Sequence, residues 1–234
     1  MSHWQEVCKR LFPDGHDIVC EDDVLLGTGR SGEREIAVLG CANQTYIGVE
    51  MALILAQAVL DVIRTHPGRP ILLLIDTLGQ RLSRHDELLG INGCLAHLAQ
   101  CLELARRRGH RIISLAYGEA VSGGYLASGM LADASYALHV ARIQVMNLPA
   151  MARITRIPLA RLEELSRTSP VFAPGVENFL RLGGITAVWS DELAMHLHAA
   201  LQDTTTEDKR RALGRERGGR THAGDAARRV RTDE

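Results

Sequence analysis

The chain of 234 residues is long enough to bury a substantial core, as one large α/β domain or two small ones. Apolar residues make up 46% of it but aromatic residues only 4%, so the core must be mainly aliphatic. A formal net charge of -1 at pH 7 gives no electrostatic reason to expect binding to nucleic acid or to a membrane surface. The five cysteines form no CxxC pair, which favours reduced thiols in a cytoplasmic protein over a disulfide framework.

Strand and helix patterns alternate along the first two thirds of the chain. Apolar residues recur at helical spacing in some segments, whereas short, nearly all-apolar runs are typical of strands covered on both faces. The expected strands cover 35–40, 70–76, 111–118, 134–138 and 142–146, and the expected helices cover 48–64, 88–108 and a segment that starts near 122. Successive strand and helix units favour a layered α/β domain with right-handed crossovers.

The pattern becomes helical from Pro158 onward. Helices are expected over 158–167, 175–182 and 190–201, with Ser190 as the N-cap of the last one. We therefore place one domain over residues 1–202. Residues 203–234 carry many charges and few large apolar side chains, so we expect a flexible tail or one that docks on a partner.

The segment GTGRSG at 27–32 matches the GxGxxG pattern of dinucleotide-binding proteins. That function requires a helix directly after the glycines, with its N-terminus on the pyrophosphate. Here a strand pattern follows instead. We interpret the segment as a hairpin turn and reject dinucleotide binding.

Ser122 lies in a variant of the GxSxG nucleophile elbow, between an expected strand and an expected helix. A serine hydrolase would also need an acidic residue and then a histidine downstream in the chain. The acidic residues nearest His196 lie in the same expected helix as that histidine, which is a poor arrangement for a triad. We therefore favour a helix N-cap role for Ser122.

The segment GEAVSGGYLASG at 118–129 leaves a buried strand and starts a helix with Gly123 and Gly124. Glycine disfavours a helix by about 1 kcal/mol relative to alanine, so the pair needs an explanation. One explanation is close packing of the helix on a strand. The other is an oxyanion hole, because N–H groups in the first helical turn lack partners within the helix and glycine leaves them open to a ligand. Both explanations stay open at this point.

A second glycine turn follows the strand that ends at Asp76. Gly79 stands three residues later, at the carboxyl end of that strand. If the two strands are neighbours in one sheet, the two glycine turns lie on the same rim.

These segments, taken in order, resemble the carboxyltransferase domains of biotin-dependent carboxylases, which belong to the crotonase superfamily. Those domains carry an IDTPG turn, a glutamate a few residues later, a long helix and a GEGGSGG turn. The corresponding residues here are Ile75–Gly79, Glu87 and Gly118–Gly124, within a similarity that covers roughly residues 25–190. Leu78, Val121 and Tyr125 depart from that pattern, and with these departures the chain resembles the γ subunits of biotin-independent malonate decarboxylases.

The resemblance implies an α/β fold of the crotonase/ClpP-like type, with repeated β-β-α units and layered sheets surrounded by helices. It also implies a heterodimer with a β subunit of the same fold, which supplies the other half of the active site. Further implied partners are an acyl carrier protein, whose CoA-derived arm presents malonate as a thioester, and an acyl carrier protein transferase. We expect this chain to bind no biotin, metal or other cofactor.

The implied reaction is decarboxylation of a malonyl thioester to an acetyl thioester and carbon dioxide. By the same resemblance, the main-chain N–H groups of Gly124 and Tyr125, with Gly123 adjacent, form the oxyanion hole, and Gly79 adds the second glycine turn. The proton donor is not evident from the sequence. Glu119 and Tyr125 are the nearest candidates, and a structural role is the alternative for each.

Three other functions remain open. The chain could be the carboxyltransferase subunit of a biotin-dependent acyl-CoA carboxylase, or a scaffold subunit in which the glycines only pack. A crotonase-like hydratase or hydrolase that acts alone on an acyl-CoA is the third. The first would purify with a biotin carboxylase, and the last would be active as a single chain.

Overall fold

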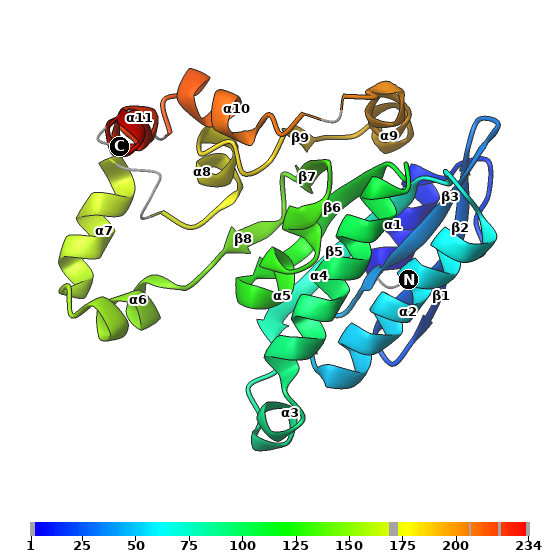
Figure 1. Cartoon of the computed structure of the whole chain (residues 1–234), viewed down its shortest axis with the longest axis horizontal. Coiled ribbons are helices and arrows are strands. Elements are labelled where there is room, and N and C mark those ends of the chain that lie inside the picture. Colours follow the sequence, from blue (N-terminus) through cyan, green and yellow to red (C-terminus); the bar gives the residue numbers. More distant parts are fainter. Residues whose placement is uncertain (1–2, 169–172, 206, 220, 233–234) are drawn as a thin grey trace.

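The computed structural model describes residues 3–168, 173–205, 207–219 and 221–232. Its centre is a nine-stranded sheet with helices on both faces (Figure 1). The strands are β1 (Val19–Glu21), β2 (Val24–Ser31), β3 (Arg34–Cys41), β4 (Thr45–Ile47), β5 (Ile71–Gln80), β6 (Ile112–Val121), β7 (Ala134–Leu138), β8 (Arg142–Gln144) and β9 (Ala187–Trp189).

The helices fall into a group that packs on the sheet and a group that follows β8. The first group is α1 (His3–Leu11), α2 (Val49–Thr65), α3 (Arg84–Leu88), α4 (Ile91–Arg107), α5 (Ser122–Leu126) and the short 3₁₀ helix η1 (Gly129–Leu131). The second group is α6 (Leu148–Thr155), α7 (Leu159–Thr168), α8 (Val176–Arg181), α9 (Leu193–Gln202), α10 (Arg210–Glu216) and α11 (Ala223–Thr232). In Figure 1, α6 and α7 extend away from the sheet.

The order along the sheet is β1-β2-β3-β5-β6-β7-β9. The pairs β1/β2 and β2/β3 are antiparallel, and every pair from β3 onward is parallel. The two central strands change partners along their length, because β4 pairs with the end of β5 and β8 pairs with the end of β6. The carboxyl ends of β5 and β6 therefore project together beyond the main sheet.

Alternating side chains of the central strands build two aliphatic cores. Leu73 and Ile75 of β5 belong to the cluster under α2 and α4. Leu72 and Leu74 belong to the cluster on the opposite face, under α1 and α9. Because successive side chains of a strand point to opposite faces, a strand buried on both sides is apolar at every position. The expected α/β class is confirmed.

The helices and strands predicted from the sequence lie where the structure has them, but several of the predicted ends are wrong. Strand 134–138 has the expected bounds, but β5 continues to Gln80 and β6 to Val121, because β4 and β8 supply additional partners there. The helix expected over 88–108 is divided at Gly90, whose φ of 75° is left-handed. The N-cap of α9 is Glu192 rather than Ser190.

The GTGRSG segment lies in a hairpin, as expected, but mostly not in its turn. Gly27 to Ser31 pair with β3, so only Gly32 of the motif lies in the connection. Gly29 is required by packing, because a Cβ there would lie 2.6 Å from ring atoms of Phe12. Most of the motif is therefore strand, and Gly29 packs on Phe12, the residue after α1.

Part of the expected tail is bound to the rest of the molecule. Arg210 donates a hydrogen bond to the carbonyl oxygen of Met130 at 2.6 Å. The guanidinium of Arg217 donates to three carbonyl oxygens, those of Leu180 (2.9 Å), Ile185 (3.0 Å) and Thr186 (2.9 Å). Helix α10 thereby packs beside α8 and η1. The flexibility expected for 203–234 as a whole stays a prediction.

We predict that Arg217→Ala lowers the free energy of unfolding by about 2 kcal/mol, because it leaves half-buried carbonyls without a donor. Chemical denaturation measures this change, and limited proteolysis should show faster cleavage within 207–219. Arg215→Ala is the matched control, since Arg215 lies in α10 and is exposed. Equal effects of the two substitutions would mean that the three hydrogen bonds do not hold the segment.

Candidate active site

The two glycine turns meet at the carboxyl ends of β5 and β6. A Cβ on Gly124 would lie 2.8 Å from the carbonyl carbon of Gly79, and a Cβ on Gly79 would lie 3.0 Å from the Cβ of Ser122. Gly79 also has a φ of +105°, which side chains rarely adopt. Main chain therefore packs directly on main chain here, and the expected meeting of the turns on one rim is confirmed.

The start of α5 determines which N–H groups are available. The helix begins at Ser122 with Val121 as its N-cap, so the N–H of Tyr125 is the first that reaches a carbonyl within the helix. The N–H groups of Gly123 and Gly124 precede it and have no acceptor in the helix. The geometry favours these two over Tyr125 as donors to a ligand.

Gln80 already bonds to one of these donors. Its side-chain oxygen accepts a hydrogen bond from the N–H of Gly123 at 3.0 Å. A side-chain amide carbonyl at this place occupies the position that a ligand oxygen would take. Gln80 was not singled out from the sequence, because it is 43 residues away from Gly123 and only the parallel pairing of β5 and β6 brings the two together.

The side chain of Tyr125 points into the core. It is 1% exposed, and its ring would be 2.7 Å from a Cβ on Gly129. Burial raises the pKa of its hydroxyl, which has no hydrogen-bond partner within the described ranges. The phenol is therefore placed to fill space beneath α5 rather than to deliver a proton above it.

Glu119 has a structural environment as well. Its carboxylate, almost fully buried, forms an ion pair with Arg142 of β8. It lines a cavity of about 370 Å³ together with residues such as His3, Asp76 and Gly118, but Gly79, Gly123 and Gly124 are not among the lining residues. The ion pair joins β6 to β8 and so supports the projecting end of β6.

Asp76 holds the base of the projection. Its buried carboxylate accepts the N–H of Glu119 at 2.8 Å and that of Gln44 at 3.1 Å. It also fills the space beside Gly118, where a Cβ would lie 2.2 Å from a carboxylate oxygen. Asp76 of the IDTLG turn thus positions the strand ends. Position 118 must be glycine because the carboxylate occupies the space that a side chain would need.

Ser122 does not have the environment of a hydrolase nucleophile. Its φ of 52° is left-handed, as in a strained elbow, but no hydrogen bond joins it to a histidine in the part of the chain that the structure describes. Its expected role as N-cap is wrong too, since Val121 takes that position and no side chain caps the helix. The site therefore offers main-chain donors instead of a nucleophile.

The described part of the chain comprises residues 3–168, 173–205, 207–219 and 221–232. Within these ranges, no group of three or more His, Cys, Asp and Glu side chains is arranged to hold a metal ion. No helix there is both long and apolar enough to cross a bilayer.

Residues 42–234 match the family of malonate decarboxylase gamma subunits. The chain belongs to this family. The malonyl-S-ACP:biotin-protein carboxyltransferase MADD of Malonomonas rubra is 33% identical over 181 residues, which are 69% of this chain and 62% of that protein. The chain thus spans less than two thirds of the length of that relative.

Solved structures agree with the family assignment. A Pseudomonas malonate decarboxylase hetero-tetramer in complex with coenzyme A matches over 100% of both chains, with a TM-score of 0.83 and 24% identity. The Pseudomonas malonate decarboxylase MdcD-MdcE hetero-dimer matches over 100% of this chain and 99% of that one, with a TM-score of 0.76 and 26% identity. The crotonase-like fold expected for a gamma subunit is confirmed.

In this gamma subunit, we predict that Gly124→Ala lowers the free energy of unfolding by about 1–3 kcal/mol, because its Cβ meets the main chain of Gly79. Gly123→Ala is the matched control. Its Cβ would meet only the end of the Gln80 side chain, at 2.9 Å, which can move. Urea denaturation of both variants measures the difference, and equal stabilities would contradict the close packing of the turns.

Proposed function

We propose that this gamma subunit, together with a β-type subunit, decarboxylates a malonyl thioester on an acyl carrier protein. The carbon–carbon bond to the carboxylate breaks, carbon dioxide leaves, and the electron pair stays on the thioester as an enolate that is then protonated. The observation that carries this proposal is the pair of N–H donors of Gly123 and Gly124 on a projecting rim. Such chemistry requires stabilisation of negative oxygen more than it requires a nucleophile.

On this proposal, the two donors hold an oxygen of the departing carboxylate or of the carbon dioxide that forms. Gln80 moves aside when that oxygen arrives, because both compete for the N–H of Gly123. The thioester carbonyl is assigned to the β subunit. Negative charge leaves the carboxylate as the bond breaks, so on this assignment the donors orient the carboxylate and hold the carbon dioxide that forms. In the reverse assignment the donors hold the thioester oxygen, and each would contribute roughly 3 kcal/mol to stabilising the charge that develops there, which far exceeds the helix penalty of a glycine.

The partners follow from the relatives. The solved Pseudomonas assemblies are a hetero-dimer and a hetero-tetramer, one of them with coenzyme A. The relative from Malonomonas rubra is named for a malonyl-S-ACP substrate. We therefore propose a β subunit and an acyl carrier protein as partners, an acyl carrier protein transferase to load it, and a cytoplasmic location.

A second candidate function is transfer of the carboxyl group to biotin. It is favoured by the name of the same relative, a biotin-protein carboxyltransferase. The two functions differ in the fate of the carboxyl group, which becomes free carbon dioxide in one and carboxybiotin in the other.

Reconstitution tests the proposal. The gamma subunit with its β subunit and a carrier protein loaded with ¹⁴C-carboxyl-labelled malonate should release labelled carbon dioxide and leave an acetyl thioester, without biotin and despite added avidin. Release that depends on a biotinylated carrier protein would favour the second function. Turnover of an acyl-CoA by the gamma subunit alone, or full turnover by the β subunit alone, would overturn the shared site.

Gln80 provides a direct probe of the hole. We predict that Gln80→Glu lowers kcat/KM at least about tenfold, because a carboxylate bonds the Gly123 N–H more strongly and repels the anionic substrate. Gln80→Ala, which removes the competitor, should keep or raise kcat/KM. Steady-state kinetics of the reconstituted complex gives both values, with assembly checked by size exclusion. Full activity of Gln80→Glu would place the reacting oxygens elsewhere.

A further inference from the structure

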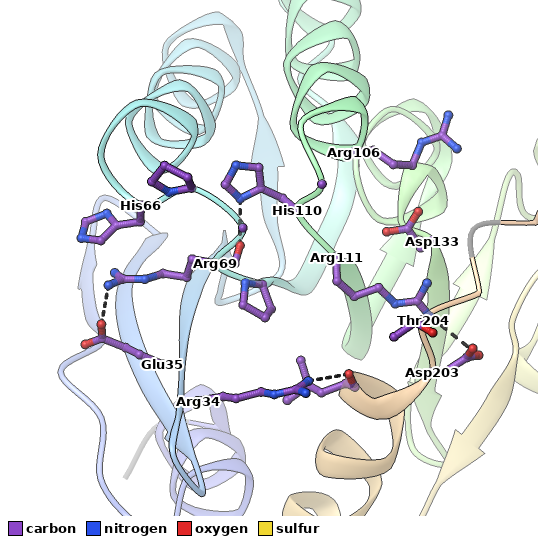
Figure 2. Close-up of a pocket in the computed structure, with 15 residues that line it drawn as sticks. Arg34, Glu35, His66, Arg69, Arg106, His110, Arg111, Asp133, Asp203 and Thr204 are labelled. Atoms are coloured by element: carbon purple, nitrogen blue, oxygen red, sulfur yellow. Dashed lines mark hydrogen bonds and ion pairs between the residues drawn. The ribbon is translucent and has the colours of Figure 1, made fainter.

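A cavity of about 650 Å³ lies at the amino ends of the parallel strands, away from the glycine turns at their carboxyl ends (Figure 2). The strands in between are parallel, so β5 runs from Ile71 near this cavity to Gln80 at the glycine turns. The residues before β5, β6 and β7 line the cavity together with the start of β3 and the segment after α9. Its volume lies within the range of small-molecule sites.

Positive charge predominates on the lining. The charged residues are Arg34, Arg69, Arg106, Arg111, Glu35, Asp133 and Asp203. All three carboxylates already have partners: Glu35 pairs with Arg69, Asp133 accepts the N–H of Ile112 at 2.8 Å, and Asp203 accepts that of Thr205 at 2.9 Å. Four arginines face three carboxylates on the lining, an excess of one positive charge, and Arg106 is also paired with Glu103 outside it.

Arg34 and Arg111 are the two arginines with donors to offer. Arg34 donates to the carbonyl oxygen of Leu201 at 2.7 Å, and Arg111 donates to that of Thr205 at 2.8 Å. Arg111 also forms an ion pair with Asp203 at 3.8 Å, beyond hydrogen-bond distance. A guanidinium has five N–H donors in a planar fork that suits phosphate oxygens. Figure 2 shows Arg34 reaching the last turn of α9 and Arg111 reaching the segment after that helix.

Two buried nitrogens of the lining residues lack partners. Nδ1 of His110 bonds to the carbonyl oxygen of Arg69 at 2.9 Å, so Nδ1 carries the hydrogen. Nε2 of His110 and Nε of Arg111 have no hydrogen-bond partner within the ranges that the structure describes. Nε of an arginine is always a donor, and a buried donor without an acceptor is unfavourable. Nε of Arg111 is closed off from the cavity, so an occupant would bond the terminal nitrogens of this guanidinium instead.

Helix capping explains only part of this cluster. Helices α2, α4 and α9 all end at this edge, and cations stabilise helix C-termini. Arg34 bonds to a last-turn carbonyl of α9 in this way. That bond uses one of five donors, so capping accounts for neither the remaining N–H groups nor a cavity of this size.

We propose that this cavity binds a phosphate-bearing small molecule of up to nucleotide size, with the phosphate held between Arg34 and Arg111. The same two arginines bond the carbonyls of Leu201 and Thr205. The ligand thereby fastens the end of α9 and the segment after it to the amino ends of the strands. This site is separate from the proposed decarboxylation, since none of the glycine turn residues lines it.

Calorimetry on the full chain tests the site, with inorganic phosphate, pyrophosphate and ADP as probes at constant ionic strength. We expect saturable binding, and binding slows proteolysis within 203–219. Arg34→Gln and Arg111→Gln should weaken binding at least about tenfold each. Arg108→Gln is the matched control, because Arg108 is exposed at the same edge but does not line the cavity.

The outcomes are distinct. Tighter binding of ADP than of pyrophosphate would assign the rest of the cavity to the organic part, and similar binding of both would indicate a simple polyphosphate site. Should Arg111→Gln fail to fold, Arg34→Gln still decides, since Arg34 is exposed. The proposal is overturned by an absence of saturable binding at about 10 mM of any probe, or by equal binding to Arg34→Gln and Arg108→Gln.

Discussion

The direct contact between the main chains of Gly79 and Gly124 sets the geometry of the candidate site. It forces the ends of β5 and β6 together, and a side chain on Gly124 would push them apart. Asp76 reinforces the contact from below by bonding N–H groups from two other segments. Close packing and open N–H groups were treated as competing explanations for the glycines. At Gly124 one produces the other, because that residue must lack a side chain in order to pack on Gly79.

The central strands and the main helices could be predicted because their signals are local. An all-apolar run such as 71–75 is a strand whichever partners it finds. The ends of β5 and β6 could not be predicted, because the strands that pair with them, β4 and β8, come from elsewhere in the chain. Helix α6 did leave a local signal, in which Asn147 caps the N–H of Ala150 and Pro149 lies in the first turn.

The same distinction holds within the site. The glycines were recognisable because glycine at a strand-to-helix turn is a local anomaly. The hydrogen bond from Gly123 to Gln80 and the ion pair between Arg142 and Glu119 were not recognisable in the sequence. Each depends on which strands become neighbours. The C-terminal segment shows a third limit. Its charged composition predicts a solvated tail, yet the guanidinium of Arg217 packs by donating to main-chain carbonyls, which composition cannot reveal.

The C-terminal segment also contacts η1, beside the amino ends of the strands. Thr205 bonds Arg111 at the arginine-lined cavity, and Arg210, five residues later, bonds Met130 in η1. Gly129 of η1 lies against the ring of Tyr125, which forms the buried side of α5. Side chains in a close-packed interior have no room to move independently. A continuous series of contacts therefore leads from Thr205 through Arg210 and η1 to the buried side of α5.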